Sequence, residues 1–197
     1  MEFDAFRQLV MDARTVRRFD ESRSVSVETL KRLVELVRYC PSGRNAQPLR
    51  YVLITSEEKR SQIFPLLKWA GYYTDWDGPS PGERPVAYLI QCLDTNYGQN
   101  CLCDDGLQLE VLNLGMRILK LGGCIIKAFD HVTIKKCLEL PEQYEPRYVF
   151  AIGYPAEEVR LENMNGSEDA DFKYYRTDDN IHHVPKRPLI ELIIKAL

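Results

Sequence analysis

The sequence predicts one domain in which helices and strands alternate, and three observations predict it. Segments 50–55, 86–92 and 147–153 are rich in β-branched and aromatic residues, as buried strands are. Apolar residues at helical spacing lie between them, most extensively over 104–121. With 197 residues, of which 45% are hydrophobic and 28% charged, the chain can bury a full core, and no repeat or linker divides it. We therefore expect a single domain, 1–197.

The first half contains two helical patterns followed by two strands. Residues 2–12 carry Phe3, Phe6 and Val10 at helical spacing. Ser26 suits the N-cap of the next helix, which must end before Pro41 because proline lacks an N–H and cannot continue a helix. Strands at 50–55 and 86–92 follow.

The second half is organised around the long helix expected over 104–121. One apolar stripe has a 4-3-4-3 spacing, and further apolar residues lie elsewhere on the helix, so it belongs at the centre of the fold or in a subunit interface. Gly122-Gly123 is expected to end it. The polar, turn-rich residues 157–180 are expected to run over the surface, and Pro188 to open a last helix.

Composition argues against several classes of protein. The net charge of -3 and the pI near 5.7 argue against nucleic-acid binding, and no apolar run approaches a membrane span. Residues 1–12 lack the features of a signal peptide, so the six scattered cysteines are expected to be reduced thiols in the cytoplasm. The spacing of Cys101, Cys103, His182 and His183 matches no standard zinc pattern, so we expect no metal site.

Basic and amide side chains form the candidate site. Arg14, Arg17 and Arg18 surround Thr15, and a guanidinium is suited to phosphate because its donors form a fixed, permanently charged fork. Residues 41–48 offer small and amide side chains that can hydrogen-bond a planar heterocycle. Together they suggest a phosphorylated aromatic cofactor. Taken singly, each basic group also fits a solvated, charged turn.

Lys186 and Arg187 precede Pro188, where the free N–H groups of a helix start also favour an anion. The chain has no G-x-G-x-x-G after a strand and no G-x-x-x-x-G-K-[ST], H-E-x-x-H or G-x-S-x-G motif. A phosphate would therefore be bound by arginine and lysine side chains and by helix N-termini.

These motifs resemble the nitroreductase family of FMN-dependent oxidoreductases. The family's opening pattern, R-S-[VI]-R-x-[FY], is matched by residues 14–19, with Thr15 in place of serine. Its pattern A-P-S-x-x-N-x-Q-P-W is matched over 40–49, with Cys40 and Leu49 as departures. The family's long central helix with a glycine-rich end resembles 104–123, and its G-[YF]-P resembles Gly153-Tyr154-Pro155.

The resemblance implies an α+β, nitroreductase-like fold, with a central, mostly antiparallel sheet flanked by helices, in a domain-exchanged homodimer with FMN at the interface. Arg14 and Thr15 would contact the phosphate and ribityl end, and Arg17 the ribityl chain or the pyrimidine edge. The variable Arg18 is expected to be solvated. The other implied contacts are Pro41, Ser42, Asn45 and Gln47 from the other subunit, backbone groups of Ile126, Lys127 and Ala128, and Lys186 and Arg187 at the phosphate.

The resemblance also implies chemistry in which NADH or NADPH and then a small-molecule acceptor, such as a nitroaromatic or a quinone, use one flavin site in turn. The family's mechanism needs no side-chain nucleophile or general base, so no catalytic residue is predicted. Two alternatives stay open: a flavoenzyme of the same fold with other redox chemistry, such as dehydrogenation or dehalogenation, and a non-catalytic FMN-binding dimer. The aromatic segment 69–76 is expected either to cover the flavin or to pack in the core or a dimer interface.

Overall fold

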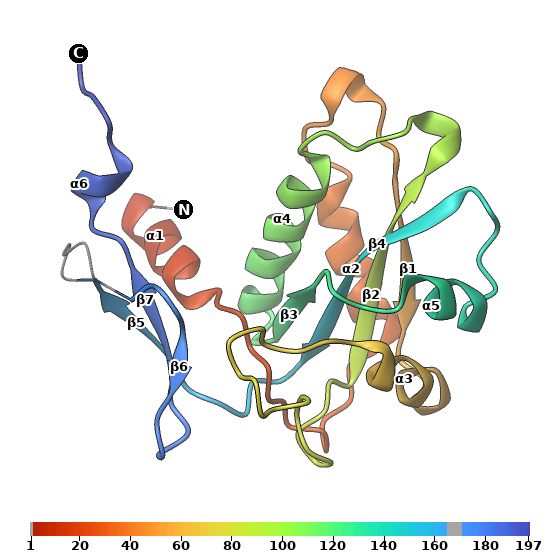
Figure 1. The fold of residues 1–197 in the computed structure, drawn as a ribbon. Coiled ribbons are helices and arrows are strands. Elements are labelled where there is room, and N and C mark those ends of the chain that lie inside the picture. The colour runs from red at the N-terminus through yellow and green to blue at the C-terminus, as the bar shows by residue number, and fades with distance from the viewer. Residues whose placement is uncertain (1, 165–170) are drawn as a thin grey trace.

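The centre of the fold is a four-stranded antiparallel sheet with the strand order β1-β2-β4-β3 (Figure 1). The computed structural model describes residues 2–164 and 171–197. The strands of this sheet are β1 (Leu49–Ile54), β2 (Ala87–Asp94), β3 (Gly122–Ile126) and β4 (Tyr144–Gly153). The expected α+β class, with a mostly antiparallel sheet flanked by helices, is confirmed.

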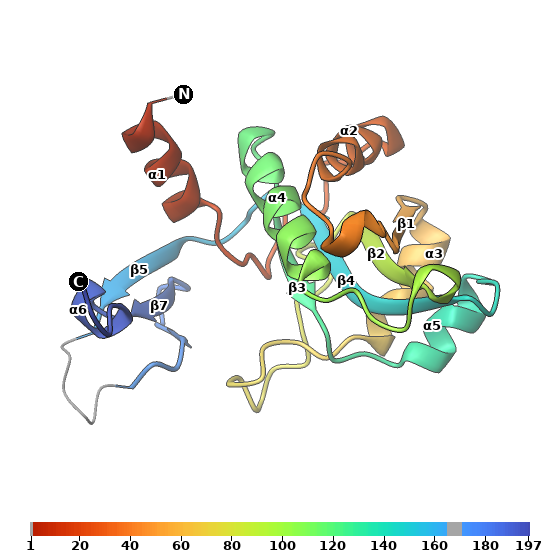
Figure 2. The same ribbon diagram turned by 90° about the horizontal axis from the view of Figure 1, so that it is seen from above.

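Helices cover both faces of this sheet (Figure 2). The helices are α2 (Val27–Val37) and α4 (Asp104–Ile118) on one face, and α3 (Glu57–Ile63) and α5 (His131–Cys137) on the other. Strand β2 is buried along its whole length because both of its faces are covered. Tyr88 and Ile90 join the core cluster that contains Ile63 of α3, whereas Ala87 and Leu89 join the cluster on the α2 and α4 side. This two-sided burial explains its largely apolar sequence, which only Gln91 and Asp94 interrupt.

A second, three-stranded sheet lies beside α1 (Phe3–Asp12), away from the central sheet (Figures 1 and 2). It consists of β5 (Val159–Asn163), β6 (Tyr175–Arg176) and β7 (His182–Lys186), with β7 in the middle, parallel to β5 and antiparallel to β6. The expectation that 157–180 only runs over the surface is therefore wrong for β5 and β6, whose short polar strands give little sequence signal. Residues 165–170 of that segment lie outside the described residues.

Helix boundaries agree with the sequence at α2 and differ at α4. The Ser26 hydroxyl accepts a hydrogen bond from the Thr29 N–H at 3.1 Å, as expected of an N-cap. Helix α4 ends at Ile118, so the expectation that Gly122-Gly123 ends it is wrong. These glycines open β3 instead, where a Cβ on Gly122 would lie 2.8 Å from a methyl group of Val16.

Two apolar surfaces are exposed in the single chain. On α4, Leu112 and Met116 are buried, whereas Leu107 and Ile118 from the 4-3-4-3 stripe are 42% and 62% exposed. The last helix expected after Pro188 begins there but does not extend to Leu197, because α6 (Leu189–Leu192) has only four residues. A helix this short needs tertiary contacts to persist, and all four of its residues are exposed.

Among the described residues, no helix is both long and apolar enough to cross a membrane. All six cysteines are free thiols, and burial raises the pKa of Cys92 to about 12 and that of Cys124 to about 11. In the described part of the chain, no three His, Cys, Asp or Glu side chains gather as metal ligands do. Location in the cytoplasm stays a prediction.

We expect Gly123→Ala to lower the free energy of unfolding by about 1–3 kcal/mol, as overpacking does. A Cβ at this position would lie 2.6 Å from the Ala151 carbonyl oxygen and 2.6 Å from the Phe150 ring. Urea unfolding measures the effect. Gly106→Ala in the first turn of α4 is the matched control, since its Cβ meets nothing within 4 Å and should raise stability by about 0.4–1 kcal/mol. Equal effects of the two variants would contradict the close packing at Gly123.

Candidate functional site

Residues 14–19 run beside β3, and this contact positions the candidate arginines. Thr15 pairs with Gly123 in a parallel bridge, and the Val16 N–H donates to the Gly123 carbonyl at 2.9 Å. Phe19 is fully buried and fills the space left by the missing side chain of Gly153. The glycines therefore allow the close approach that fixes the arginine-bearing segment on the sheet.

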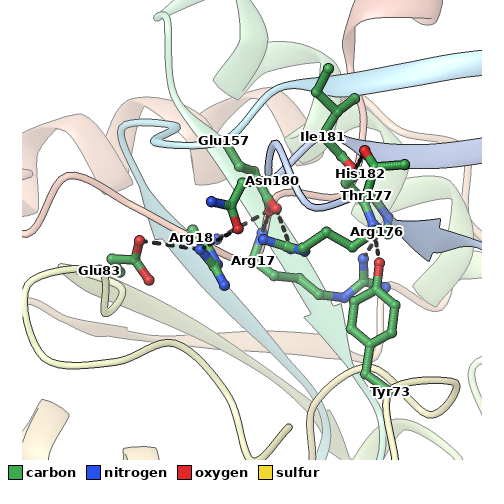
Figure 3. A network of polar contacts seen from close by, with 10 residues as sticks. All are labelled: Arg17, Arg18, Tyr73, Glu83, Glu157, Arg176, Thr177, Asn180, Ile181 and His182. Atoms are coloured by element: carbon green, nitrogen blue, oxygen red, sulfur yellow. Dashed lines mark hydrogen bonds and ion pairs between the residues drawn. The ribbon is translucent and has the colours of Figure 1, made fainter.

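Arg17 is buried between the central body and the second sheet (Figure 3). Its Nη1 lies 3.0 Å from His182 Nε2, and its guanidinium carbon lies 4.6 Å from the centre of the Tyr174 ring, a cation–π contact. Its buried Nε–H has no acceptor among residues 2–164 and 171–197. The side chain is thus held firmly by neutral partners.

The contact with Arg17 fixes the tautomer of His182. Arginine only donates, so Nε2 must be the acceptor, and the proton of the neutral ring lies on Nδ1. Tyr73 Oη lies 2.5 Å from Nδ1 and accepts this proton's hydrogen bond (Figure 3). Burial, then the charges of Arg17 and Arg176, lower the pKa of His182 to about 4. His182 is therefore neutral at physiological pH and links Arg17 to the aromatic segment.

Glu157 is the buried anion of this network (Figure 3). Its carboxylate pairs with Arg176 at 2.5 Å and accepts hydrogen bonds from the backbone N–H groups of Arg17 and Arg18. Its charge is thus compensated by Arg176, and the Arg17 side chain has no ion pair within the described ranges. A buried cation without a counter-charge favours the binding of an anion.

Arg18 is not solvated as expected. Its side chain is only 22% exposed, and its Nη1 lies 3.5 Å from a Glu83 carboxylate oxygen and 3.2 Å from the Asn180 side-chain oxygen. Arg18 therefore connects the 14–19 segment to neighbouring loops, and its charge is already paired.

Arg14 and Lys186 form a second cationic group. Arg14 Nη2 donates to the Val10 carbonyl at 2.9 Å, and its Nε–H is buried with no acceptor in the described part of the chain. Burial, then the nearby charge of Arg14, lower the pKa of Lys186. For residues 2–164 and 171–197, neither cation has an ion pair with a carboxylate. Repelling cations and an unused buried donor fit a phosphate group.

Arg187 is not part of this group as the structure stands, because its Nη1 pairs with Glu191 at 2.9 Å. Thr15 is exposed beside Arg14 and keeps its hydroxyl free for a ligand in the described structure. Arg14, Thr15, Arg17 and Lys186 thus stay candidates for the expected basic site, whereas Arg187 would have to leave Glu191 to join it.

The loop of residues 41–48 is organised by the buried carboxylate of Asp104. The Ser42 hydroxyl donates to Asp104 at 2.6 Å and accepts from the Gln47 N–H at 2.8 Å. Gln47 Nε2 in turn donates to the Asn45 side-chain oxygen at 3.0 Å. Asn45 and Gln47 both adopt positive φ, at 55° and 47°. These contacts fix the loop that carries Pro41 and the predicted amide groups.

This loop and the basic site lie at opposite ends of α4 (Figure 1). Asp104 begins the helix, whereas Asn113 and Arg117, near its end, contact Ala13 and Asp12 just before Arg14. A helix of 15 residues is about 22 Å long at 1.5 Å per residue. One protomer therefore does not bring Pro41, Ser42, Asn45 and Gln47 to Arg14.

The end of β3 lies beside the aromatic segment. Ile126 is buried, whereas Lys127 is exposed with its ammonium 5.7 Å from the centre of the Tyr148 ring. The Ala128 carbonyl accepts a hydrogen bond from the Lys68 N–H at 2.9 Å. The expected backbone contacts of Ile126, Lys127 and Ala128 thus lie next to residues 69–76, and Trp69 of that segment is packed against Phe64 and Trp76.

The residues that surround Arg17 were not among the site residues predicted from the sequence. These are Tyr73, Glu157, Tyr174, Arg176 and His182. His182 and His183 at the start of β7 are both buried, so the strand shows no alternation of inward and outward residues that could have marked His182.

We expect His182 to stay neutral as pH falls, with a midpoint near 4 instead of the ordinary 6.5. Because the folded pKa lies below the unfolded one, its contribution to stability is present above about pH 6.5 and is lost as pH falls to about 4. Nitrogen NMR of the imidazole rings measures both midpoint and tautomer, and His182→Gln identifies the signal. A midpoint near 6.5, or a proton on Nε2, would contradict the network.

Known proteins resemble this chain along most of its length. The sequence model of the nitroreductase family matches residues 10–78. The oxygen-insensitive NADPH nitroreductase of Helicobacter acinonychis is 32% identical over an alignment length of 164, and the match covers 67% of this chain and 78% of that protein. The corresponding protein of Helicobacter pylori strain J99 is 21% identical over an alignment length of 171, and the match covers 71% of this chain and 81% of the relative.

Solved structures show the same fold. The nitroreductase family protein of Streptococcus pneumoniae aligns with a TM-score of 0.71 and 17% identity, covering 97% of this chain and all of that one. An FMN-dependent nitroreductase of Clostridium difficile aligns with a TM-score of 0.63 and 18% identity, covering 76% of this chain and 87% of that one. The H. acinonychis relative and the matched family model establish that this chain belongs to the nitroreductase family.

Proposed function

We propose that the protein is an FMN-dependent oxidoreductase that passes electrons from NAD(P)H to nitroaromatic, quinone or similar acceptors. The observation that carries this proposal is the group of unpaired cations, Arg14, Arg17 and Lys186, with two buried guanidinium N–H donors that lack acceptors in the described chain. An anionic cofactor would balance the charges of these three cations. The family membership and the NADPH nitroreductases among the relatives support the choice of FMN and of a nicotinamide donor.

The residues divide into two functions. Arg14, Thr15 and Lys186 would hold the phosphate, and Arg17 would face the ribityl chain or the pyrimidine edge of the flavin. When bound, FMN supplies the capacity to accept and release a hydride. Arg17, fixed by His182 and Tyr174, keeps a positive charge where negative charge develops during reduction, and a prearranged charge costs no reorganisation at that moment.

We also propose a homodimer whose two subunits share each flavin site. The loop of Pro41, Ser42, Asn45 and Gln47 lies a helix length from Arg14, so a second protomer is needed to place these groups at the flavin. Exposed apolar side chains supply a surface for that contact. They include Phe3 and Phe6 on α1, Ile118 on α4, and Ile190, Ile194 and Leu197 at the C-terminus.

One site used by donor and acceptor in turn predicts ping-pong kinetics. The reaction needs no nucleophile from the protein, and the basic groups described above bind and orient without accepting a proton.

We expect Arg14→Ala to weaken FMN binding about tenfold or more, because a hydrogen bond to a charged group contributes roughly 1.5–3 kcal/mol. Arg18→Ala should cost far less, since Glu83 and Asn180 already occupy the Arg18 guanidinium. Flavin fluorescence titration of the two apoproteins measures both affinities for FMN. Mass spectrometry of the cofactor released from the unmodified protein should identify FMN and not FAD. Equal losses would show that the phosphate site is misplaced.

For the proposed reaction, we expect NADH or NADPH to bleach the yellow holoprotein under anaerobic conditions and a nitroaromatic or a quinone to restore the colour. Initial rates at several concentrations of both substrates should give parallel double-reciprocal lines. A flavin that binds but is not reduced by either nicotinamide would favour a sensory or storage role. Intersecting lines would contradict the shared site.

A further inference from the structure

An aromatic-walled cavity of about 830 Å³ opens between residues 64–77, Arg84 and Ala128. Four of its walls are aromatic side chains: Phe64, Trp69, Tyr73 and Trp76. The volume lies within the range of small-molecule sites, and aromatic walls are typical of sites for planar ligands. The phosphate and pyrimidine contacts proposed for the flavin do not involve this cavity.

One cation at this cavity has no counter-charge. The Arg84 guanidinium lies 4.3 Å from the centre of the Phe64 ring, and within the described ranges it forms no ion pair, although Asp77 also lines the cavity. A guanidinium that lines a cavity without a carboxylate partner favours an anionic ligand there.

The cavity adjoins the residues proposed to hold the flavin. Ala128, at the end of β3, lines it directly. The Tyr73 ring lines it as well, while the Tyr73 hydroxyl accepts from His182, whose other nitrogen contacts Arg17 (Figure 3). A ligand in the cavity would therefore lie next to both the pyrimidine-edge arginine and the backbone after β3.

The backbone of the wall is also held in an unfavourable conformation. Ala70 lines the cavity with φ at 36°, a left-handed region that residues with a Cβ rarely adopt, and its carbonyl accepts from the Tyr73 N–H at 2.8 Å. Such conformations cluster at ligand-binding sites, where the surrounding contacts enforce them.

We propose that this cavity binds the electron acceptor and selects a planar aromatic carboxylate. The ring lies among the four aromatic side chains, and the carboxylate pairs with the Arg84 guanidinium, which lines the cavity. Lys68 at the rim adds a second positive charge. That the ligand is the electron acceptor rests on the proposed function, whereas the binding of an aromatic anion rests on the cavity alone.

The two tryptophans of the chain, Trp69 and Trp76, both line the cavity, so intrinsic tryptophan fluorescence reports on it directly. The holoprotein is titrated with 4-nitrobenzoate and with the neutral, similarly shaped 4-nitrobenzamide. We expect saturable quenching, with 4-nitrobenzoate binding more tightly. Arg84→Met should weaken 4-nitrobenzoate about tenfold and 4-nitrobenzamide less than threefold, since it removes a charged hydrogen-bond donor. Arg32→Met, an exposed position on α2, is the matched control and should change neither.

A second variant guards against a folding defect in Arg84→Met. A Cβ at Gly71, which lines the cavity, meets nothing within 4 Å, so Gly71→Leu can extend into open space without strain. It should weaken both probes at least tenfold and slow reoxidation of the reduced flavin by 4-nitrobenzoate. Quenching that rises linearly without saturation, or equal losses of both probes in Arg84→Met with normal binding in Gly71→Leu, would overturn the proposal.

Reduction of the flavin by NADPH, measured on the same samples without acceptor, separates the two proposals. Saturable, Arg84-dependent binding without any flavin reduction would overturn the proposed function and the acceptor role together. Normal reduction without binding of either probe would overturn the cavity proposal and leave the proposed function intact.

Discussion

The buried carboxylate of Glu157 joins the 14–19 segment to β6 of the second sheet. It accepts hydrogen bonds from the backbone N–H groups of Arg17 and Arg18 and forms an ion pair with Arg176. Only 1% of the Glu157 side chain is exposed. A buried carboxylate with one cationic partner and two backbone donors is fully satisfied. Removing the carboxylate would leave the cation and the two N–H groups unpaired in the interior, and removing the cation would leave the carboxylate charge unpaired. This contact keeps Tyr174 and His182 within reach of Arg17, so the geometry of the candidate site depends on it.

The four arginines near this carboxylate differ in what balances their charge. Arg176 has Glu157 and Arg18 has Glu83, so both connect parts of the fold. Arg17 has an aromatic face and a neutral imidazole, and Arg14 has a backbone carbonyl, none of which carries a negative charge. Neutral partners hold a guanidinium in place without cancelling its field, which is the arrangement that an anion-binding site requires.

Prediction from the sequence succeeded where a local pattern decides the structure. The apolar runs of β1, β2 and β4 and the Ser26 cap are local, and so is the arginine motif that led to the family. It failed at Gly122-Gly123, where the pair reads as a helix stop but serves the close approach of Val16. It could not find His182, because the partner that defines its role, Arg17, is 165 positions away.

Tyr73 connects the two halves of the proposed site, because its ring and its hydroxyl have different neighbours. The ring is part of the cavity wall, and the hydroxyl accepts from His182, which in turn accepts from Arg17. A ligand that shifts this ring must change the length of the hydrogen bond to His182, and a flavin that draws on Arg17 changes the same chain from its other end. Coupling of this kind is reciprocal in free energy, so occupancy of the cavity and affinity for the flavin should influence each other equally. The aromatic segment is then more than core packing, because the Tyr73 hydroxyl group connects the proposed acceptor cavity to the proposed cofactor residue Arg17 through His182.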